Sequence, residues 1–172
     1  CIFQAFNSYL SGNLTESNKI LGPSLEKVNK YPSTLGYQEN VWLAGLIAFQ
    51  MNDADALGSA ITKLEKTNKK YKFSKSAYHA TYKYYVHLKI LEAIEKKDKA
   101  GMEKFLSILD NDIIEKVKNH SSVFDYSFIN YHLSKVFSAG RFANPANASA
   151  FRQKANKKNK FYATLTPGIH RI

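Results

Sequence analysis

The chain has 172 residues, 44% hydrophobic and 23% charged, which is a globular composition and excludes a disordered or collagen-like chain. It has no apolar run long enough to span a bilayer, and its single cysteine excludes an internal disulfide framework and a cysteine-rich zinc site. The net charge of +11 favours an acidic partner: nucleic acid, an anionic membrane surface or an acidic protein.

Cys1 is the only cysteine, and no methionine precedes it. This position is typical of a processed bacterial lipoprotein, in which a signal peptide is cut before a cysteine that then carries acyl chains. Ile2 rather than an aspartate favours, by resemblance to such lipoproteins, the periplasmic face of the outer membrane. The alternatives are a sequence that begins mid-chain, where the cysteine has no such meaning, and a cytoplasmic protein. The apolar residues 2–6 also differ from the usual flexible tether.

Apolar residues recur at helical spacing throughout, so the sequence predicts an all-α fold. A first short helix ends near Ser11-Gly12, and Asn13 caps a second helix that is broken or kinked at Gly22-Pro23. The predicted elements that follow are a helix ending at Asn52, a helix over 56–64 with a basic exit at 66–72, and the longest helix, which opens at Ser74 or Ser76 and closes near Lys97-Asp98.

The C-terminal third continues the helical pattern. Its predicted elements are short helices over 102–109 and 113–117, a helix through 128–137 ended by Gly140, a last helix from Pro145 to about Lys157, and an irregular tail. We expect one α-helical repeat domain over residues 1–157 and an extended C-terminal tail over residues 158–172.

The sequence repeats itself with a shift of 45 residues, which places residues 42–64 on residues 87–109. The apolar positions keep their character, and Asp53 meets Asp98 at the turn. Weaker matches place residues 9–13 and 136–140 at the same helix-to-helix turn. The chain is therefore expected to contain about four antiparallel helical hairpins that stack and complete one another's core.

The segment 42–49, the polar turn at Asn52-Asp53 and the segment 56–64 resemble a tetratricopeptide (TPR) helical hairpin, with small residues for close helix approach. The spacing departs from the repeat of about 34 residues in that family. The resemblance implies a short TPR-like solenoid with a concave surface that binds a peptide or protein, and it implies no chemistry. A plain irregular helical bundle is the alternative.

Motifs for catalysis are missing from the sequence: it has no nucleophile elbow, no glycine-rich phosphate loop and no paired carboxylates with a partner motif. His79 and His87 lie eight residues apart, without a third ligand at metal-binding spacing. We therefore expect a non-enzymatic protein without a metal or cofactor.

Two basic segments with aromatic residues are the candidate partner-binding sites. In the tyrosine-rich helix, Tyr78, Tyr82 and Tyr85 are expected to face the core, and Tyr84 and the lysines to face solvent. The alternative is that the tyrosines and lysines together bind nucleic acid, a peptidoglycan-like polymer or an acidic peptide. The candidate binding residues are Tyr84, Lys69, Lys70, Lys72, Arg152, Lys154, Lys157, Lys158, Phe161 and Tyr162.

The function expected from these features is a non-enzymatic protein–protein interaction scaffold or assembly subunit, anchored to the bacterial envelope through lipidated Cys1. The alternative is a soluble basic helical-repeat protein that binds nucleic acid or a ribonucleoprotein.

Overall fold

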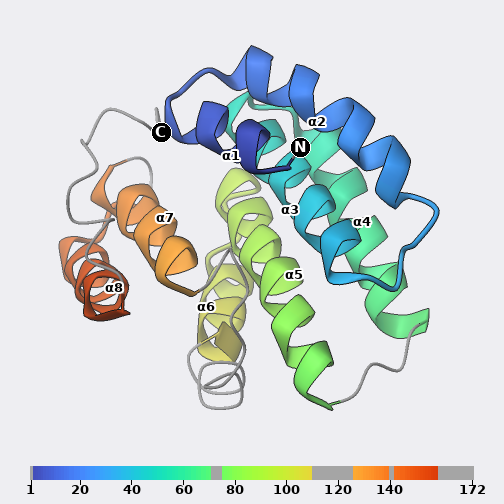
Figure 1. Cartoon of the computed structure of the whole chain (residues 1–172). Coiled ribbons are helices and arrows are strands. Elements are labelled where there is room, and N and C mark those ends of the chain that lie inside the picture. Colours follow the sequence, from blue (N-terminus) through green and yellow to red (C-terminus); the bar gives the residue numbers. More distant parts are fainter. Residues whose placement is uncertain (1, 71–74, 110–125, 140–141, 159–172) are drawn as a thin grey trace. The chain divides into compact units, whose positions relative to one another are not determined.

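The computed structural model describes residues 2–70, 75–109, 126–139 and 142–158, and within these residues the protein is all-α, as predicted (Figure 1). The described helices are α1 (Ile2–Leu10), α2 (Leu14–Val28), α3 (Leu35–Gln50), α4 (Ala54–Lys70), α5 (Lys75–Glu95), α6 (Lys99–Ile108), α7 (Tyr126–Ser138) and α8 (Pro145–Lys158). The short helix predicted over 113–117 and the tail over 159–172 lie outside the described residues.

The chain divides into two compact units. Unit 1 covers Cys1–His120 and contains α1–α6, and unit 2 covers Ser121–Ile172 and contains α7 and α8. This division differs from the single domain that the sequence predicts over residues 1–157. Each unit is described by itself below.

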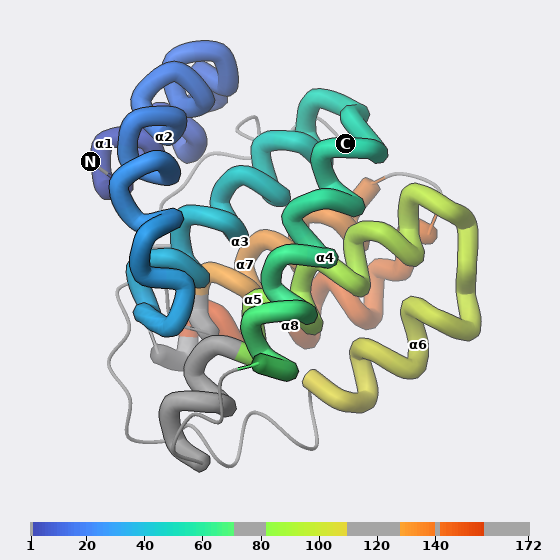
Figure 2. Tube along the Cα trace, turned by 90° about the vertical axis from the view of Figure 1, so that its right-hand side faces the viewer, coloured from blue at the N-terminus to red at the C-terminus, as the bar shows by residue number. Residues whose placement is uncertain are grey.

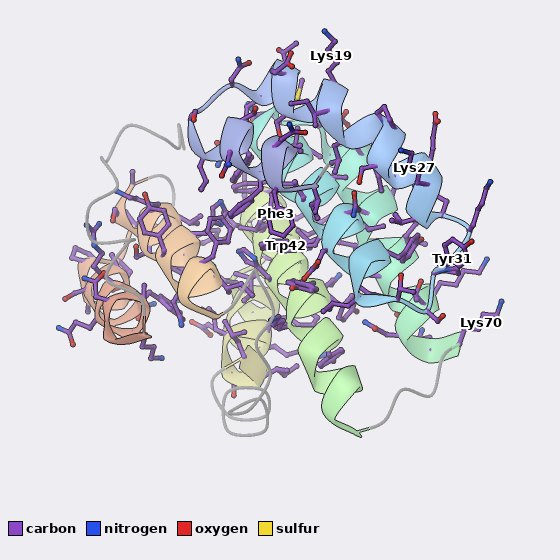
Figure 3. All side chains as sticks on the ribbon, viewed as in Figure 1. Phe3, Lys19, Lys27, Tyr31, Trp42 and Lys70 are labelled. Atoms are coloured by element: carbon purple, nitrogen blue, oxygen red, sulfur yellow. The ribbon has the colours of Figure 1, made fainter. Side chains whose placement is uncertain are left out.

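In unit 1 every helix packs against the next one in the chain, and two longer-range contacts join α1 to α3 and α3 to α5. The helix α3 is therefore the middle of the unit, because it also contacts α2 and α4. Figure 2 shows α2 and α4 next to α3. Twelve of the sixteen residues of α3 are buried, because neighbours cover the helix on several sides. Its largest buried side chain is that of Trp42 (Figure 3).

The three turns α1–α2, α3–α4 and α5–α6 share one backbone conformation. The residue before the capping residue has a positive φ in each: 77° at Gly12, 56° at Asn52 and 61° at Lys97. The next backbone N–H then donates to the carbonyl five residues earlier, as in a helix C-cap with a left-handed residue. These bonds are Asn13 to Ser8 at 2.9 Å, Asp53 to Ala48 at 2.9 Å and Asp98 to Ala93 at 2.8 Å.

Each of these turns also begins its second helix with the same type of cap. The side-chain oxygen of the capping residue accepts from the backbone N–H three residues later, which satisfies one of the free donors of the first helical turn. The distances are 3.2 Å at Asn13, 2.9 Å at Asp53 and 2.9 Å at Asp98. The sequence placed these three turns in register, and that equivalence is confirmed. The turn predicted at 136–140 lies partly outside the described residues.

Of the break or kink predicted at Gly22-Pro23, the break is absent, because the helix runs without interruption from Leu14 to Val28; the kink stays a prediction. Proline removes one backbone donor and leaves the carbonyl one turn earlier without its partner. That carbonyl belongs to Lys19, an exposed residue (Figure 3), so water can satisfy it. The proline is therefore tolerated within the helix.

Gly45 is the point of closest approach within unit 1. A Cβ atom at this position would lie 2.5 Å from Leu88 Cδ1 on α5 and 3.3 Å from Ala60 Cβ on α4. Real Cβ contacts essentially never reach the first of these distances, so a side chain at this position would displace the buried end of Leu88, and glycine leaves the room for α3 to pack closely on α5. The prediction that small residues permit close helix approach is confirmed at Gly45 and Ala60.

Candidate partner-binding surface

The last turns of α4 form a basic ridge. Lys66, Lys69 and Lys70 are exposed, and Lys70 projects from the end of the helix (Figure 3). They line a shallow hollow of about 500 Å³ together with Thr62 and Glu65. One acidic side chain is included: Glu65 accepts from Lys69 at 2.8 Å, and the Lys69 side chain remains 75% exposed. The ridge is therefore solvated and positive, since an exposed pair of this kind binds its partner weakly.

A second hollow, of about 210 Å³, lies between α4 and α5 and shares two of these residues. Its lining residues are Glu65, Asn68, Lys69, Tyr82 and Tyr85. The two tyrosine rings stack, with centroids 5.6 Å apart and planes inclined by 25°, and both residues are half-buried. We call the residues that line the two hollows the tyrosine–lysine surface. It consists of Thr62, Glu65, Lys66, Asn68, Lys69, Lys70, Tyr82 and Tyr85.

The aromatic side of this surface continues onto α6. The ring of Phe105 lies edge-on to Tyr85, with centroids 6.3 Å apart and planes at 84°. Lys89 and Lys104 place their Nζ atoms 5.5 and 5.7 Å from the Phe105 centroid, within cation–π range. Aromatic faces and lysine amines thus alternate along α5 and α6.

The expected orientation of α5 is wrong at Tyr84. We expected Tyr84 to face solvent and Tyr82 and Tyr85 to face the core, but Tyr84 is fully buried and the other two line the open hollow. The cause is Trp42 of α3, whose ring lies 4.8 Å from that of Tyr84 and draws this face of α5 inward. Tyr84 is therefore a core residue and is removed from the candidate binding residues.

Lys83 also departs from the expectation that the lysines of this segment are exposed, because it is only 1% exposed. Its Nζ lies 4.9 Å from the Tyr84 centroid, and its charge acts on the carboxyl group of Glu39 in α3. Lys69 and Lys70 do face solvent as expected. Lys72 lies outside the described residues.

A buried polar cluster joins α3 to α5. Trp42 Nε1–H donates to His87 Nδ1 at 3.1 Å, and the Tyr84 hydroxyl donates to Glu39 Oε1 at 3.3 Å. Burial lowers the pKa of His87 to about 3, so the ring is neutral and can accept the indole proton. Burial also raises the pKa of Glu39, against the opposing effects of the Tyr84 hydrogen bond and the charge of Lys83.

The sequence analysis did not predict this cluster, although the repeat of 45 residues in the sequence indicates it. Both hydrogen bonds join residues exactly one repeat of 45 positions apart, because equivalent positions of α3 and α5 face each other. The sequence analysis considered His87 as a metal ligand without a partner, and its hydrogen bond to Trp42 shows that it is a buried histidine with a hydrogen-bond partner. Aligning the two helices position by position could have identified both pairs.

The C-terminal candidate residues belong to unit 2. On α8, Arg152 is half-buried and Lys154 is exposed, with its Nζ 5.2 Å from the Phe151 centroid. Lys157 and Lys158 complete the helix, and their side chains lie outside the described part of the structure. Cys1, Phe161 and Tyr162 also lie outside it.

Neither a metal centre nor a membrane span is found in the part of the chain that the structure describes. Its His, Cys, Asp and Glu residues form no group of three or more that could hold a metal ion. None of its helices is long and apolar enough to cross a bilayer. In comparisons with known proteins, no family model, no curated protein and no solved structure matches the chain.

Proposed function

We propose that the chain is a helical-hairpin repeat scaffold that binds an acidic segment of a partner protein on its tyrosine–lysine surface. The observation that carries the proposal is the surface itself: three exposed lysines next to a stacked tyrosine pair, in two adjoining hollows. Lysine amines attract carboxylates, and half-buried tyrosine rings supply contact area at a low cost in side-chain entropy.

The repeat organisation supports a scaffold of this kind. The turn that joins α3 to α4 recurs between α5 and α6, and hydrogen bonds connect equivalent positions of α3 and α5. Helices arranged in this order are typical of stacked hairpins, in which each hairpin contacts mainly its neighbours. In such proteins extended surfaces along the stack bind peptides, which is also what the resemblance to TPR proteins implies.

The experiment measures binding of a Glu- and Asp-rich peptide of about 12 residues to the full chain by calorimetry at low ionic strength. The triple variant Lys66→Glu, Lys69→Glu and Lys70→Glu should weaken binding at least about tenfold, because it reverses the charge of the ridge. A matched control, Lys19→Glu, Lys27→Glu and Lys30→Glu, changes the net charge equally at exposed positions of α2 and of the turn after it. The control should retain the affinity within about twofold.

Equal losses in the two triple variants would mean attraction by net charge alone, and the proposal would fail. Tyr82→Leu tests the tyrosine contribution, since leucine keeps an apolar side chain and removes the stacking ring. A single-stranded RNA of equal charge is the second ligand. RNA binding that is tighter than peptide binding and equally sensitive to the triple variant would replace the proposal by the nucleic-acid alternative.

The lipid anchor on Cys1 and a place on the outer membrane remain predictions. They are tested by the intact mass of the protein after detergent extraction from its native source. An increment equal to two or three acyl chains on Cys1 is the expected result, and an unmodified cysteine, or residues ahead of it, would contradict the anchor.

A further inference from the structure

A third hollow of unit 1 lies along α3, between α2 and α4, and has a volume of about 240 Å³. Its described lining is mostly apolar, so we call it the apolar groove. The apolar residues that matter below are Leu25, Val41, Ala44, Ala48, Met51 and Ala60. The alanines leave the groove open, because a methyl side chain fills little of the space between neighbouring helices.

The rim of the apolar groove has apolar surface that water still reaches. The Met51 side chain is 51% exposed at one end, and Leu25 on α2 is half-buried. Burial of such surface by a bound apolar side chain is favourable, since it removes apolar area from water. Methionine is flexible and adapts its shape to a bound group. The groove is therefore suited to an apolar side chain of another molecule.

The two ends of the apolar groove carry opposite charges. Asp53, at the start of α4, lines one end, and Lys63, ten residues further along, lines the other. Both residues are exposed, and they lie about 15 Å apart along the helix axis at about 1.5 Å per residue. An acidic ligand is repelled at the Asp53 end and attracted at the Lys63 end, so charge complementarity gives the bound chain a direction.

The apolar groove adjoins the tyrosine–lysine surface along α4. Residues three apart on a helix are neighbours, with Cβ atoms about 5–6 Å apart. Ser59 and Lys63 line the groove, and the residues three positions later, Thr62 and Lys66, line the basic hollow. A chain bound along α4 can therefore contact both surfaces at once.

We propose that the apolar groove binds an apolar side chain of the same partner segment whose acidic residues bind the lysines of the tyrosine–lysine surface. This inference rests on the function proposed above, and it specifies the partner: a protein segment with an apolar anchor beside its acidic stretch. On α4 the two linings are centred about 10 Å apart along the axis. An extended chain covers this distance in about three residues.

Two other occupants match the apolar groove less well. A second copy of the chain brings a net charge of +11 towards the exposed lysines of α4, which repels it. Small-molecule ligands usually fill pockets of about 300–1,000 Å³ that enclose most of their surface. The apolar groove is smaller than that and is continuous with a solvated basic surface.

The experiment measures, by calorimetry with the full chain, the binding of three peptides that share one acidic stretch of about six residues. Two peptides have a leucine three residues before or three residues after this stretch, and the third has serine at both places. The tighter of the two leucine peptides should bind at least about tenfold better than the serine peptide, because it buries a leucine side chain.

Ser59→Leu fills the groove from an exposed position of α4 and should remove this gain, while the affinity for the serine peptide changes by less than about twofold. Ser33→Leu is the matched control, since it adds the same side chain at an exposed position of the turn between α2 and α3, and it should keep the gain. The triple lysine variant should weaken binding of all three peptides. Circular dichroism checks that each variant is folded.

The outcomes separate this inference from the proposed function. Equal affinities of the leucine and serine peptides, a gain that persists in Ser59→Leu, or a gain that Ser33→Leu also removes would overturn the inference alone, provided that the triple lysine variant still weakens the serine peptide. Leucine-peptide binding that the triple lysine variant leaves unchanged would overturn both. A concentration-dependent dimer that Ser59→Leu disrupts would assign the groove to a second copy of the chain and overturn the inference.

Discussion

The two units differ in how far acidic residues balance their basic residues. Unit 1 has 17 Lys against 13 Asp and Glu over 120 residues, and its described ion pairs are all between neighbouring turns of one helix. Unit 2 has eight basic residues against one acid over 52 residues, and among its described residues Lys135 is buried, as Lys83 is in unit 1. In unit 1 four lysines, Lys69, Lys89, Lys96 and Lys99, have a described acidic partner, whereas in unit 2 the segment from Tyr126 to Lys158 has no acidic residue of its own.

The largest expected effect is a loss of stability of unit 1 when its closest helix contact, at Gly45, is disrupted. Gly45→Val should lower the free energy of unfolding by about 3 kcal/mol, because the new side chain overlaps Leu88 and Ala60. Hydrogen exchange of the full chain should show lost protection in α1–α6 and retained protection in α7 and α8. Equal loss in both units would mean that they unfold as one cooperative body.

The matched control is Gly58→Ala on α4, where a Cβ atom would have no neighbour within 4 Å. This change should stabilise the protein by about 0.5–1 kcal/mol through helix propensity alone. If Gly58→Ala instead destabilised the protein, helix propensity would not be the main effect of replacing this glycine, and Gly58 would no longer serve as the control for Gly45→Val.

The second effect is loss of stability in acid through the buried histidine of unit 1. The pKa of His87 is about 3 in the folded protein and 6.5 without the fold, so below pH 6.5 the unfolded chain binds a proton that the folded chain excludes. The contribution of neutral His87 to the free energy of unfolding is therefore present above pH 6.5 and is lost as the pH falls towards 3. The raised pKa of Glu39 acts in the opposite sense, since a protonated Glu39 is easier to bury.

His87→Gln isolates this contribution, because the amide oxygen can accept the proton of Trp42 and does not titrate. Between pH 7 and pH 4, denaturant unfolding should show that the wild type loses on the order of 3 kcal/mol more than the variant. Parallel pH profiles for the two proteins would mean that His87 is not buried in its neutral form.

The third prediction tests whether the equivalent turns contribute equally to stability. Asp53→Ala and Asp98→Ala should each cost about 1 kcal/mol, because each removes the same cap from the first turn of a helix. Asn144→Ala is the comparison in unit 2, where Asn144 Oδ1 accepts from the Asn147 backbone N–H at 3.1 Å at the start of α8. Costs for Asp53 and Asp98 that differ by more than about 1 kcal/mol would contradict the equivalence.

The smallest effect concerns the exposed pair on the tyrosine–lysine surface. Glu65→Gln removes the partner of Lys69 and should change the unfolding free energy by less than about 0.5 kcal/mol. The same change should strengthen binding of the acidic peptide, since it removes the only carboxylate among the described residues that line the two hollows. Weaker peptide binding in Glu65→Gln would assign Glu65 a direct contact with the ligand.

The turns could be predicted from the sequence because their chemistry is local. A capping Asp or Asn defines the side-chain hydrogen bond, and the spacing repeats at Asp53 and Asp98. The residue before the cap takes a positive φ, which Gly12 and Asn52 adopt readily, whereas Lys97 gives no such signal in the sequence. The continuity of α2 through Pro23 could not be predicted, because it depends on solvent reaching one carbonyl group.

The orientation of α5 could not be predicted for a different reason. Apolar and aromatic residues occupy seven of the eleven positions 85–95 and lie on several sides of the helix, so helical periodicity does not select one buried face. The choice is made by Trp42, which lies 42 residues before Tyr84 in the sequence and packs against its ring at a tilt of 34°. The tyrosine–lysine surface follows from that contact, since it leaves Tyr82 and Tyr85 on the open side.

The position of Trp42 gives the protein a built-in optical reporter. It is the only tryptophan of the chain, its indole is fully buried, and it contacts both Tyr84 and His87. Its emission should therefore be blue-shifted in the folded state, should receive excitation energy from Tyr84, and should be quenched when His87 takes up a proton. Intrinsic fluorescence thus follows the α3–α5 contact of unit 1 directly, without any label.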